Sequence, residues 1–383
     1  MAIRDVKRLP LIHQTMFAEL VARGMDADFS AQFPENGSFR LLESNGRSYW
    51  YYVGYKPATV PNGKPTRPQM YVGPFDDPEI TARVETFAGI KADYQARRKM
   101  VASLRSAGLP APTGRVGEVV GALARAGIFR LRSVLIGSVA FQSYSGYLGV
   151  LVPKALSLTG DADFAQFHSI SILAGDSTPP MLDVLQTVDP TFREVPHIEH
   201  PVIGTKYRNA DKFYVEFLVP NRGSDDYQGK PTKMPALGGA GAEPMCFLDY
   251  LIYQPVRSVL LHRDGIVVSV PAPERYAIHK LIVATHRKDD DNGRSKGRKD
   301  AMQAGALIQA LNIEGRGIDV GFAWMEAWDR GERWKRALGI GVKRLDNDER
   351  ETLRHLVSEA CEADGKDPSD YGLAEGAAVP PPP

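Results

Sequence analysis

The stretch LTGDADFAQF, residues 158–167, contains two aspartates one residue apart within an apolar run. In a β-strand, side chains at positions i and i+2 point to the same face. Asp161 and Asp163 would therefore share one face, with Ala162 and Phe164 directed to the core. Because like charges on one face repel each other, two explanations stay open: a solvated strand face, or a pair of ligands to a divalent metal ion.

The two predicted strands on either side of this stretch carry further polar groups. Upstream, LIGSVAFQ at 135–142 predicts a buried strand that ends at Gly137-Ser138, where a helix begins at once. Backbone N–H groups at such a helix N-terminus are suited to bind phosphate. Downstream, Glu216 is the only acid in the predicted strand KFYVEFLVP, 212–220. Since Mg²⁺ prefers carboxylates and phosphate oxygens, Glu216 would be a third ligand if its strand neighbours the Asp-x-Asp strand.

This order of features, Gly-Ser, then Asp-x-Asp, then a later acid in a strand, resembles the nucleotidyltransferase superfamily typified by DNA polymerase beta. More narrowly, the region from about 133 to 312 resembles a bacterial family of nucleotidyltransferase-fold proteins. The segments that carry this likeness are GSVAFQSYSGYLGV, GDADFAQFHS, VEFLVPNRGSDDY, MPALGGAGAEPMCFLDYLI and VPAPERYAIHKLIVA.

The resemblance implies roles for particular residues. Gly137 and Ser138 would hold the triphosphate of an NTP. Asp161 and Asp163 would be ligands of Mg²⁺ or Mn²⁺. Glu216 would be the third carboxylate, which in the superfamily helps to activate the acceptor hydroxyl. The three acids are thus the expected metal ligands and also the expected catalytic residues.

The segment after residue 273 resembles the helical part that follows the catalytic sheet in several nucleotidyltransferases, including toxin-type ones. There, a lysine on the first helix faces the nucleotide phosphates, and Lys280 is the residue that matches it. A solvated helix lysine is an equally good interpretation of Lys280. Lys299 and Asp300 would open the next helix, and residues 286–299 before them would form a surface loop.

The expected fold class is α+β, with a polymerase-beta-like mixed sheet, flanking helices, a C-terminal helical region and an N-terminal α/β-hairpin region. The hairpin is predicted around Ser44-Asn45-Gly46, and residues 161–175 are expected to form one strand run. GLPAPTG at 108–114 is the best linker candidate. The expected divisions are an N-terminal region at 1–110, a catalytic domain at 111–273, a helical domain at 274–370 and a disordered tail at 371–383.

Composition narrows the class of protein. The 383 residues carry a formal net charge of +1, so no global field indicates nucleic acid or membrane as a partner. Two cysteines far apart in the sequence form no disulfide framework. The N-terminus lacks the apolar core of a signal peptide, and no stretch reaches the ~20 apolar residues of a membrane span. We expect a soluble cytoplasmic protein with no membrane partner.

The predicted activity is metal-dependent transfer of a nucleoside monophosphate from an NTP such as ATP to a hydroxyl acceptor, with release of pyrophosphate. The acceptor would be RNA, such as tRNA, or DNA, another nucleotide or a protein side chain, and the N-terminal region would bind it. Two alternatives stay open. One is a non-catalytic nucleotide- or nucleic-acid-binding protein, supported by the 22 residues between Ser138 and Asp161, more than is usual in the superfamily. The other is a toxin-type enzyme that modifies tRNA.

Overall fold

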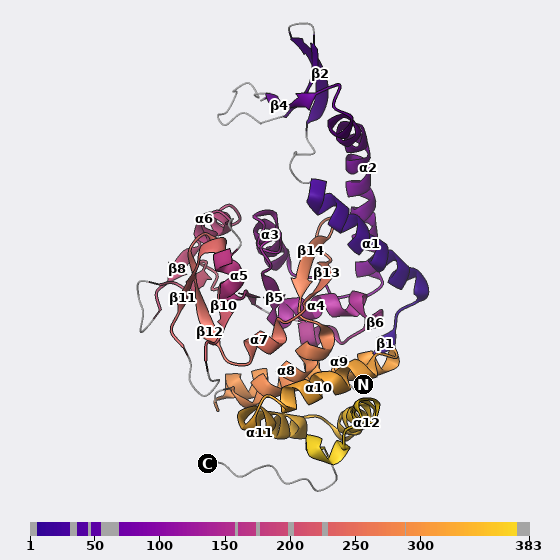
Figure 1. Ribbon diagram of the computed structural model, residues 1–383, viewed down its shortest axis with the longest axis vertical. Helices are drawn as coiled ribbons and strands as arrows, with labels where there is room; N and C mark the ends of the chain where they lie inside the picture. The colour runs from indigo at the N-terminus through magenta and orange to yellow at the C-terminus, as the bar shows by residue number, and fades with distance from the viewer. Residues whose placement is uncertain are drawn as a thin grey trace.

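The chain folds into three successive regions, which Figure 1 shows from top to bottom as a hairpin arm, a mixed sheet with its helices, and a layer of C-terminal helices. The computed structural model describes residues 6–30, 37–44, 47–54, 69–157, 160–173, 177–197, 203–223, 229–287 and 289–373. The predicted disordered tail from 371 lies outside the described residues from position 374 onward.

The central sheet is mixed, as the sequence predicted. Its main path runs β11-β12-β10-β7-β5. In addition, β9 pairs with β10, and β8 pairs with β9. β10 runs parallel to both β7 and β12, whereas its pairing with β9, and the pairing of β5 with β7, are antiparallel. The strands are β5 (Val134–Ile136), β7 (Asp161–Ala165), β8 (Arg193–Val195), β9 (Lys206–Arg208), β10 (Tyr214–Pro220), β11 (Thr232–Met234) and β12 (Ala240–Met245).

Short helices and one hairpin surround this sheet. The helices are α3 (Gly114–Arg125), α4 (Gly137–Tyr147), α5 (His168–Leu173), α6 (Met181–Gln186) and α7 (Leu248–Leu251), and β13 (Val256–Leu260) pairs with β14 (Ile266–Val270). The single strand run predicted for residues 161–175 is wrong, because the strand ends at Ala165 and α5 follows. A six-residue helix is too short for its 3.6-residue period to stand out from a strand pattern.

The C-terminal helices are α8 (Pro273–Thr285), α9 (Asp291–Ile313), α10 (Gly317–Trp328), α11 (Glu332–Gly341) and α12 (Asn347–Asp364). The prediction that Lys299 and Asp300 open a helix is wrong, since α9 already begins at Asp291. The Asp290 side chain caps it by accepting a hydrogen bond from the Gly293 backbone N–H. Most of the predicted surface loop 286–299 is therefore helical, and it brings its basic residues onto a rigid element.

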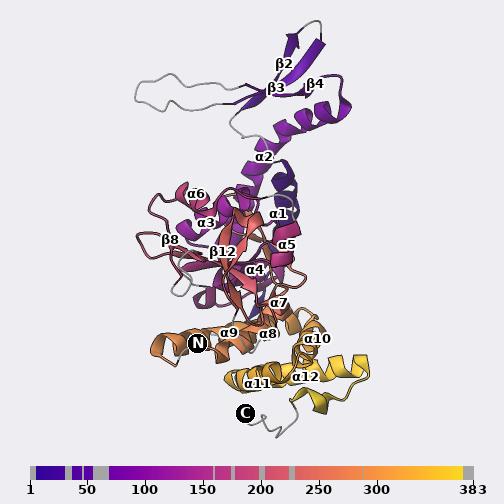
Figure 2. The same ribbon diagram turned by 60° about the vertical axis from the view of Figure 1, so that its left-hand side comes forward.

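The N-terminal region contains β1 (Lys7–Arg8), α1 (Leu11–Ser30), β2 (Ser38–Ser44), β3 (Arg47–Val53), β4 (Gln69–Pro74) and α2 (Pro78–Ser106). The predicted hairpin is confirmed, because β2 and β3 pair antiparallel up to Ser44 opposite Arg47. Its turn residues, Asn45 and Gly46, lie outside the described residues. Figure 2 shows β2, β3 and β4 extending away from the central sheet at the end of α2.

The base of this arm is tied to the central region. β1 pairs with β6 (Val150–Leu151), and α1 packs on α4 and on the β13–β14 hairpin. Leu109, within the predicted linker, is 3 % exposed and shares a hydrophobic cluster with Phe17 and Leu20 of α1. Leu109 thus anchors the predicted linker to this cluster. The predicted domain boundaries themselves stay predictions.

The pairing of β1 with β6 also accounts for the long segment between Ser138 and Asp161. After α4 the chain forms β6 and the short 3₁₀ helix η1 (Lys154–Ser157) before it enters β7. The additional residues therefore attach the N-terminal strand. Among the helices that the structure describes, none is long and apolar enough to cross a membrane.

The contact between α1 and α4 gives a test of this attachment. A Cβ atom added at Gly146 of α4 would overlap the Phe17 ring. We expect Gly146→Ala to destabilise the protein by about 1–3 kcal/mol, as overpacking in a core does, measured by urea denaturation. In a Phe17→Ala background the same change should have a much smaller effect. An equal loss in both backgrounds would contradict close packing of α1 against α4.

Candidate active site

Three carboxylates meet on one face of the central sheet. β7 and β10 are parallel neighbours, with Asp163 directly opposite Glu216. Because alternate residues of a strand share a face, Asp161 and Asp163 lie on the same side as Glu216. Ala162 and Phe164 are fully buried on the other side. The register of two strands thus brings together the three acids that the sequence singled out.

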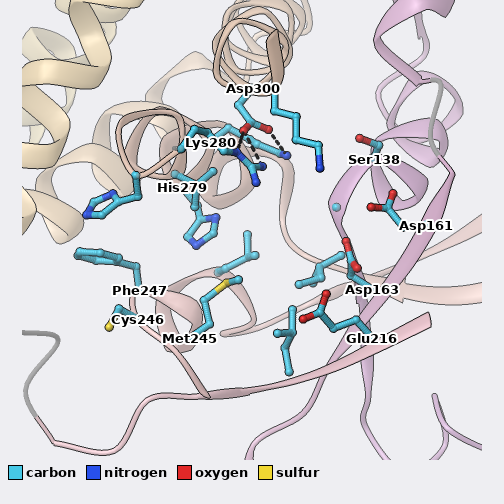
Figure 3. A pocket seen from close by; sticks show the side chains of 18 of the residues that line it. Ser138, Asp161, Asp163, Glu216, Met245, Cys246, Phe247, His279, Lys280 and Asp300 are labelled. Atoms are coloured by element: carbon cyan, nitrogen blue, oxygen red, sulfur yellow. Dashed lines mark hydrogen bonds and ion pairs between the residues drawn. The ribbon is translucent and has the colours of Figure 1, made fainter. Parts of the chain in front are cut away.

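These acids line a cavity of about 850 Å³, a size within the usual range of small-molecule sites. A solvated strand face does not describe Asp161 and Asp163, since both are half-buried in the cavity wall. The structure brings together along this one cavity all six residues that the resemblance assigned: Gly137, Ser138, Asp161, Asp163, Glu216 and Lys280. Figure 3 shows Ser138 and the three acids on one side of the cavity.

The Gly137 turn lies directly against one of these acids. Gly137 has a positive φ of 66° where β5 ends and α4 begins, and β5 places Ile136 opposite Asp163. A Cβ atom at Gly137 would lie 2.7 Å from Asp163 Oδ2, closer than side chains pack. Both the backbone conformation and the space therefore require glycine. The next residue, Ser138, accepts a hydrogen bond at its Oγ from Lys299 Nζ at 2.9 Å.

A buried ion-pair network forms part of the helical wall of the cavity. Lys280 Nζ donates to Asp300 Oδ1 at 2.6 Å, and Arg287 Nε donates to Asp300 Oδ2 at 2.8 Å. Burial opposes ionisation of Asp300, but the charges of Lys280 and Arg287 outweigh it and keep the pKa of Asp300 below its usual value. Since the Lys280 side chain is 8 % exposed, its interpretation as a solvated helix lysine is wrong.

Lys299 is a second lysine in this wall, and the resemblance did not assign it. Burial, and then the nearby charge of Lys280, lowers the pKa of Lys299. Its hydrogen bond to Ser138 joins α9 to the start of α4, and the two residues lie 161 positions apart in sequence. Spacing along the chain gives no signal of such a contact. Lys299 therefore lies closer than the sequence suggested to the turn predicted to bind phosphate.

The acidic and basic side chains of the cavity come from different layers. The acids at its sheet side belong to β7, β10 and β12: Asp161, Asp163, Glu216 and Glu243. The cations belong to the helical side: Lys280, Arg287, Lys296, Lys299 and Arg333. Asp300, in the ion-pair network, is the acid among the helical lining residues. The cavity is thus negative toward the sheet and positive toward the helices.

Crowding of the acids changes the protonation of Asp163. Burial, and then the carboxylates of Asp161 and Glu216, raises the pKa of Asp163 to about 8. Glu216 forms an ion pair with Lys206 at 2.8 Å, where β9 and β10 place the two residues opposite each other. Asp163 therefore retains its proton near neutral pH, and a cation bound beside it would favour the ionised form.

The acids of the cavity fit a divalent cation only where further oxygen ligands complete its coordination. Among the described residues, no group of three or more histidine, cysteine or acidic side chains converges to hold a metal ion by itself, and Glu216 is engaged by Lys206. Mg²⁺, however, is typically bound by one or two carboxylates together with substrate phosphates and water. Asp161 and Asp163 supply such a platform, with Glu216 on the neighbouring strand.

The sequence profile of a family described as Nucleotidyltransferase matches residues 114–329, more than half of the 383 residues. The chain belongs to this nucleotidyltransferase family. It is therefore a transferase, and nucleotidyl transfer is the general activity of its family. All six residues assigned from the sequence, together with Lys299, lie within the matched region. Comparisons with curated proteins and with solved structures find no match.

The raised pKa of Asp163 predicts how stability depends on pH. An unfolded chain releases this proton near pH 4, whereas the folded protein keeps it up to about pH 8. Stability contributed by this group therefore falls as pH rises between these values. In the presence of a chelator, the Tm advantage of Asp163→Asn over wild type should grow from pH 5 to pH 8 and then level off.

The matched control for this measurement is Asp370→Asn, an exposed aspartate outside the cavity lining. It controls for the loss of one carboxylate from the protein without a change in the cavity. A pH-independent difference for Asp163→Asn would show that Asp163 titrates normally in the folded protein.

Proposed function

We propose that the cavity transfers a nucleoside monophosphate from an NTP to a hydroxyl acceptor in a metal-dependent reaction, on a polymerase-beta-like catalytic layout. The observation that carries this proposal is the register of β7 and β10, which sets Asp161, Asp163 and Glu216 on one face beside the Gly137-Ser138 turn. Family membership supports nucleotidyl transfer in general. The metal, the substrate and the residue roles are the parts that we propose.

In this proposal the triphosphate lies between the start of α4 and the helical wall. Backbone N–H groups at Gly137 and Ser138 face the phosphate oxygens, and Lys299, already bonded to Ser138 Oγ, adds a positive charge. Lys280 contributes positive charge without contacting the phosphates, because its Nζ donates a hydrogen bond to Asp300 Oδ1 at 2.6 Å. Lys280 therefore has chiefly a positioning role, and Lys299 is the more direct phosphate contact.

Asp161 and Asp163 would hold Mg²⁺ or Mn²⁺, with Glu216 as the third carboxylate. When bound, the ion would neutralise charge on the phosphates and relieve repulsion among the acids. The acceptor oxygen forms a bond to the α-phosphorus while the bond from that phosphorus to the pyrophosphate oxygen breaks. Glu216 takes the proton of the acceptor hydroxyl, and pyrophosphate leaves with the electron pair of the broken bond. Catalysis then consists mostly of positioning and charge neutralisation.

The acceptor that we propose is a nucleic-acid hydroxyl, in RNA such as tRNA or in DNA. Lys296 and Arg333 lie in the cavity lining, and Lys and Arg side chains bind backbone phosphates without regard to sequence. The hairpin arm of β2, β3 and β4 projects from the same chain and would extend the acceptor surface. We further propose that the reaction takes place in the cytoplasm and that ATP is among the NTP substrates.

Label transfer tests this function. Purified protein with Mg²⁺ or Mn²⁺ is incubated with each NTP and with tRNA, total RNA or DNA. Label in the α-phosphate should enter the acceptor, and label in the γ-phosphate should appear in pyrophosphate. Asp161→Ala combined with Asp163→Ala should reduce transfer by at least roughly 10³-fold, the order expected when charge stabilisation is lost. Asp370→Asn should transfer as wild type does.

The outcomes separate the alternatives. Transfer that persists in the double variant would contradict the metal assignment. Transfer of the γ-label to the acceptor would show phosphorylation in place of nucleotidyl transfer. NTP binding without transfer to any acceptor would support a non-catalytic protein. Growth arrest on expression, relieved by the double variant, would support the toxin-type alternative.

The two lysines should differ in what their loss affects. Lys299→Ala should weaken NTP binding by about 10-fold or more, since it removes a charged phosphate contact, with little change in stability. Lys280→Ala should destabilise the fold by about 3 kcal/mol, because it breaks a buried pair and leaves Asp300 with Arg287 alone. Calorimetric titration and urea denaturation measure the two effects. Loss of NTP binding at unchanged stability in Lys280→Ala would return the direct phosphate role to Lys280.

A further inference from the structure

The cavity continues beyond the carboxylates to a wall of different chemistry. This wall is formed by Met245, Cys246 and Phe247, where β12 leads into α7, and by Val283 of α8. Figure 3 shows Met245, Cys246 and Phe247 on the side away from Ser138 and the aspartates. Phosphates and metal ions gain nothing from apolar contacts. A planar ring gains much, because burying its faces removes apolar surface from water.

A buried histidine nitrogen faces this apolar wall. His279 of α8 is 4 % exposed and lines the cavity, and its Nε2 has no hydrogen-bond partner within the described part of the chain. Figure 3 shows its imidazole directed into the cavity toward Met245. Burial, and then the charge of Lys280, lowers the pKa of His279 to about 3, so the ring is neutral. Buried polar atoms nearly always have partners, and here a ligand would provide one.

Phe247 has an unfavourable backbone conformation that its neighbours hold in place. Its φ of 65° lies in the left-handed region that bulky residues rarely adopt. The Phe247 ring packs edge-on against Trp334, with the two ring centroids 4.7 Å apart. The guanidinium carbon of Arg333 lies 5.2 Å from the centroid of the Phe247 ring. Backbone strain of this kind clusters at ligand sites when the surrounding structure supports it. The packing fixes Phe247 and Arg333 as a rigid boundary of the cavity.

We propose that this wall binds the nucleobase of the NTP and that His279 is the residue that discriminates between bases. The inference rests on the proposed function, because it places a second part of the same substrate. A neutral imidazole presents either a donor or an acceptor at Nε2, according to its tautomer. It therefore favours bases that offer the complementary group at that position and leaves the others with an unpaired polar atom.

Direct binding tests this assignment without requiring turnover. Calorimetric titration compares ATP, GTP, CTP and UTP with inorganic tripolyphosphate, which has no base. Wild type should bind one base class more tightly than the rest. His279→Leu should lose about 10-fold for that base, the effect of one hydrogen bond, and should bind the four NTPs nearly equally. Its affinity for tripolyphosphate should stay at the wild-type level, which also shows that the cavity is folded.

A second variant keeps the test independent of changes within α8. Met245→Trp adds bulk to the apolar wall itself, across the cavity from His279. It should weaken binding of all four NTPs while leaving tripolyphosphate binding unchanged. The matched control is His355→Leu, which replaces a histidine on α12 whose side chain is 70 % exposed and outside this cavity. It should bind every ligand as wild type does.

The failure of this inference is distinguishable from failure of the proposed function. If wild type binds the NTPs but His279→Leu keeps the wild-type ranking of bases and Met245→Trp keeps the wild-type NTP affinities, the base site is overturned and the proposed function stands. If His279→Leu loses tripolyphosphate and NTP binding equally, His279 only positions Lys280, and its role in base recognition is overturned. If wild type binds neither NTP nor tripolyphosphate, both proposals fail.

Discussion

Crowding of three acids on one face of the sheet, which raises the pKa of Asp163, is the constraint on which the rest of the cavity depends. The pairing of β7 with β10 sets Asp161, Asp163 and Glu216 on one face, and a slip by one residue would turn β10 over and send Glu216 to the core. Fully buried residues on the opposite face, Phe164 and Phe217 among them, hold that register. Strong packing on one face of the sheet thus maintains an unfavourable electrostatic arrangement on the other.

Sequence reasoning was most reliable where one strand decides the outcome. Two-residue alternation placed Asp161 and Asp163 together, and a glycine at the end of an apolar strand located the turn at Gly137. It failed where local periods are ambiguous, as in the short helix α5. It also failed where contacts join distant segments, since no pattern along the chain links Lys299 to Ser138. Nor does any pattern predict that His279 Nε2 has no partner among the residues that the structure describes. The roles of these residues stay proposals.

The long segment between Ser138 and Asp161 illustrates how a departure from a familiar spacing can have a structural cause. Its residues form β6 and η1, and β6 pairs with β1 near the start of the chain. The insertion leaves β7 in register with its neighbours, so it does not displace the acids from the cavity. The spacing alone is therefore weak support for a protein that has lost activity, because its added residues serve to attach the N-terminal region.

The division of charge between sheet and helices has a consequence for how a ligand arrives. A cavity lined only by cations would attract any polyanion, in any orientation, with an affinity that drops steeply with salt. Here the acids of the sheet face the cations of α8, α9 and α11, so the cavity acts as a fixed dipole with a small net charge. Such a field orients a charged ligand more than it attracts it. It would turn the triphosphate end of the NTP that we propose as substrate toward the helices before any contact forms.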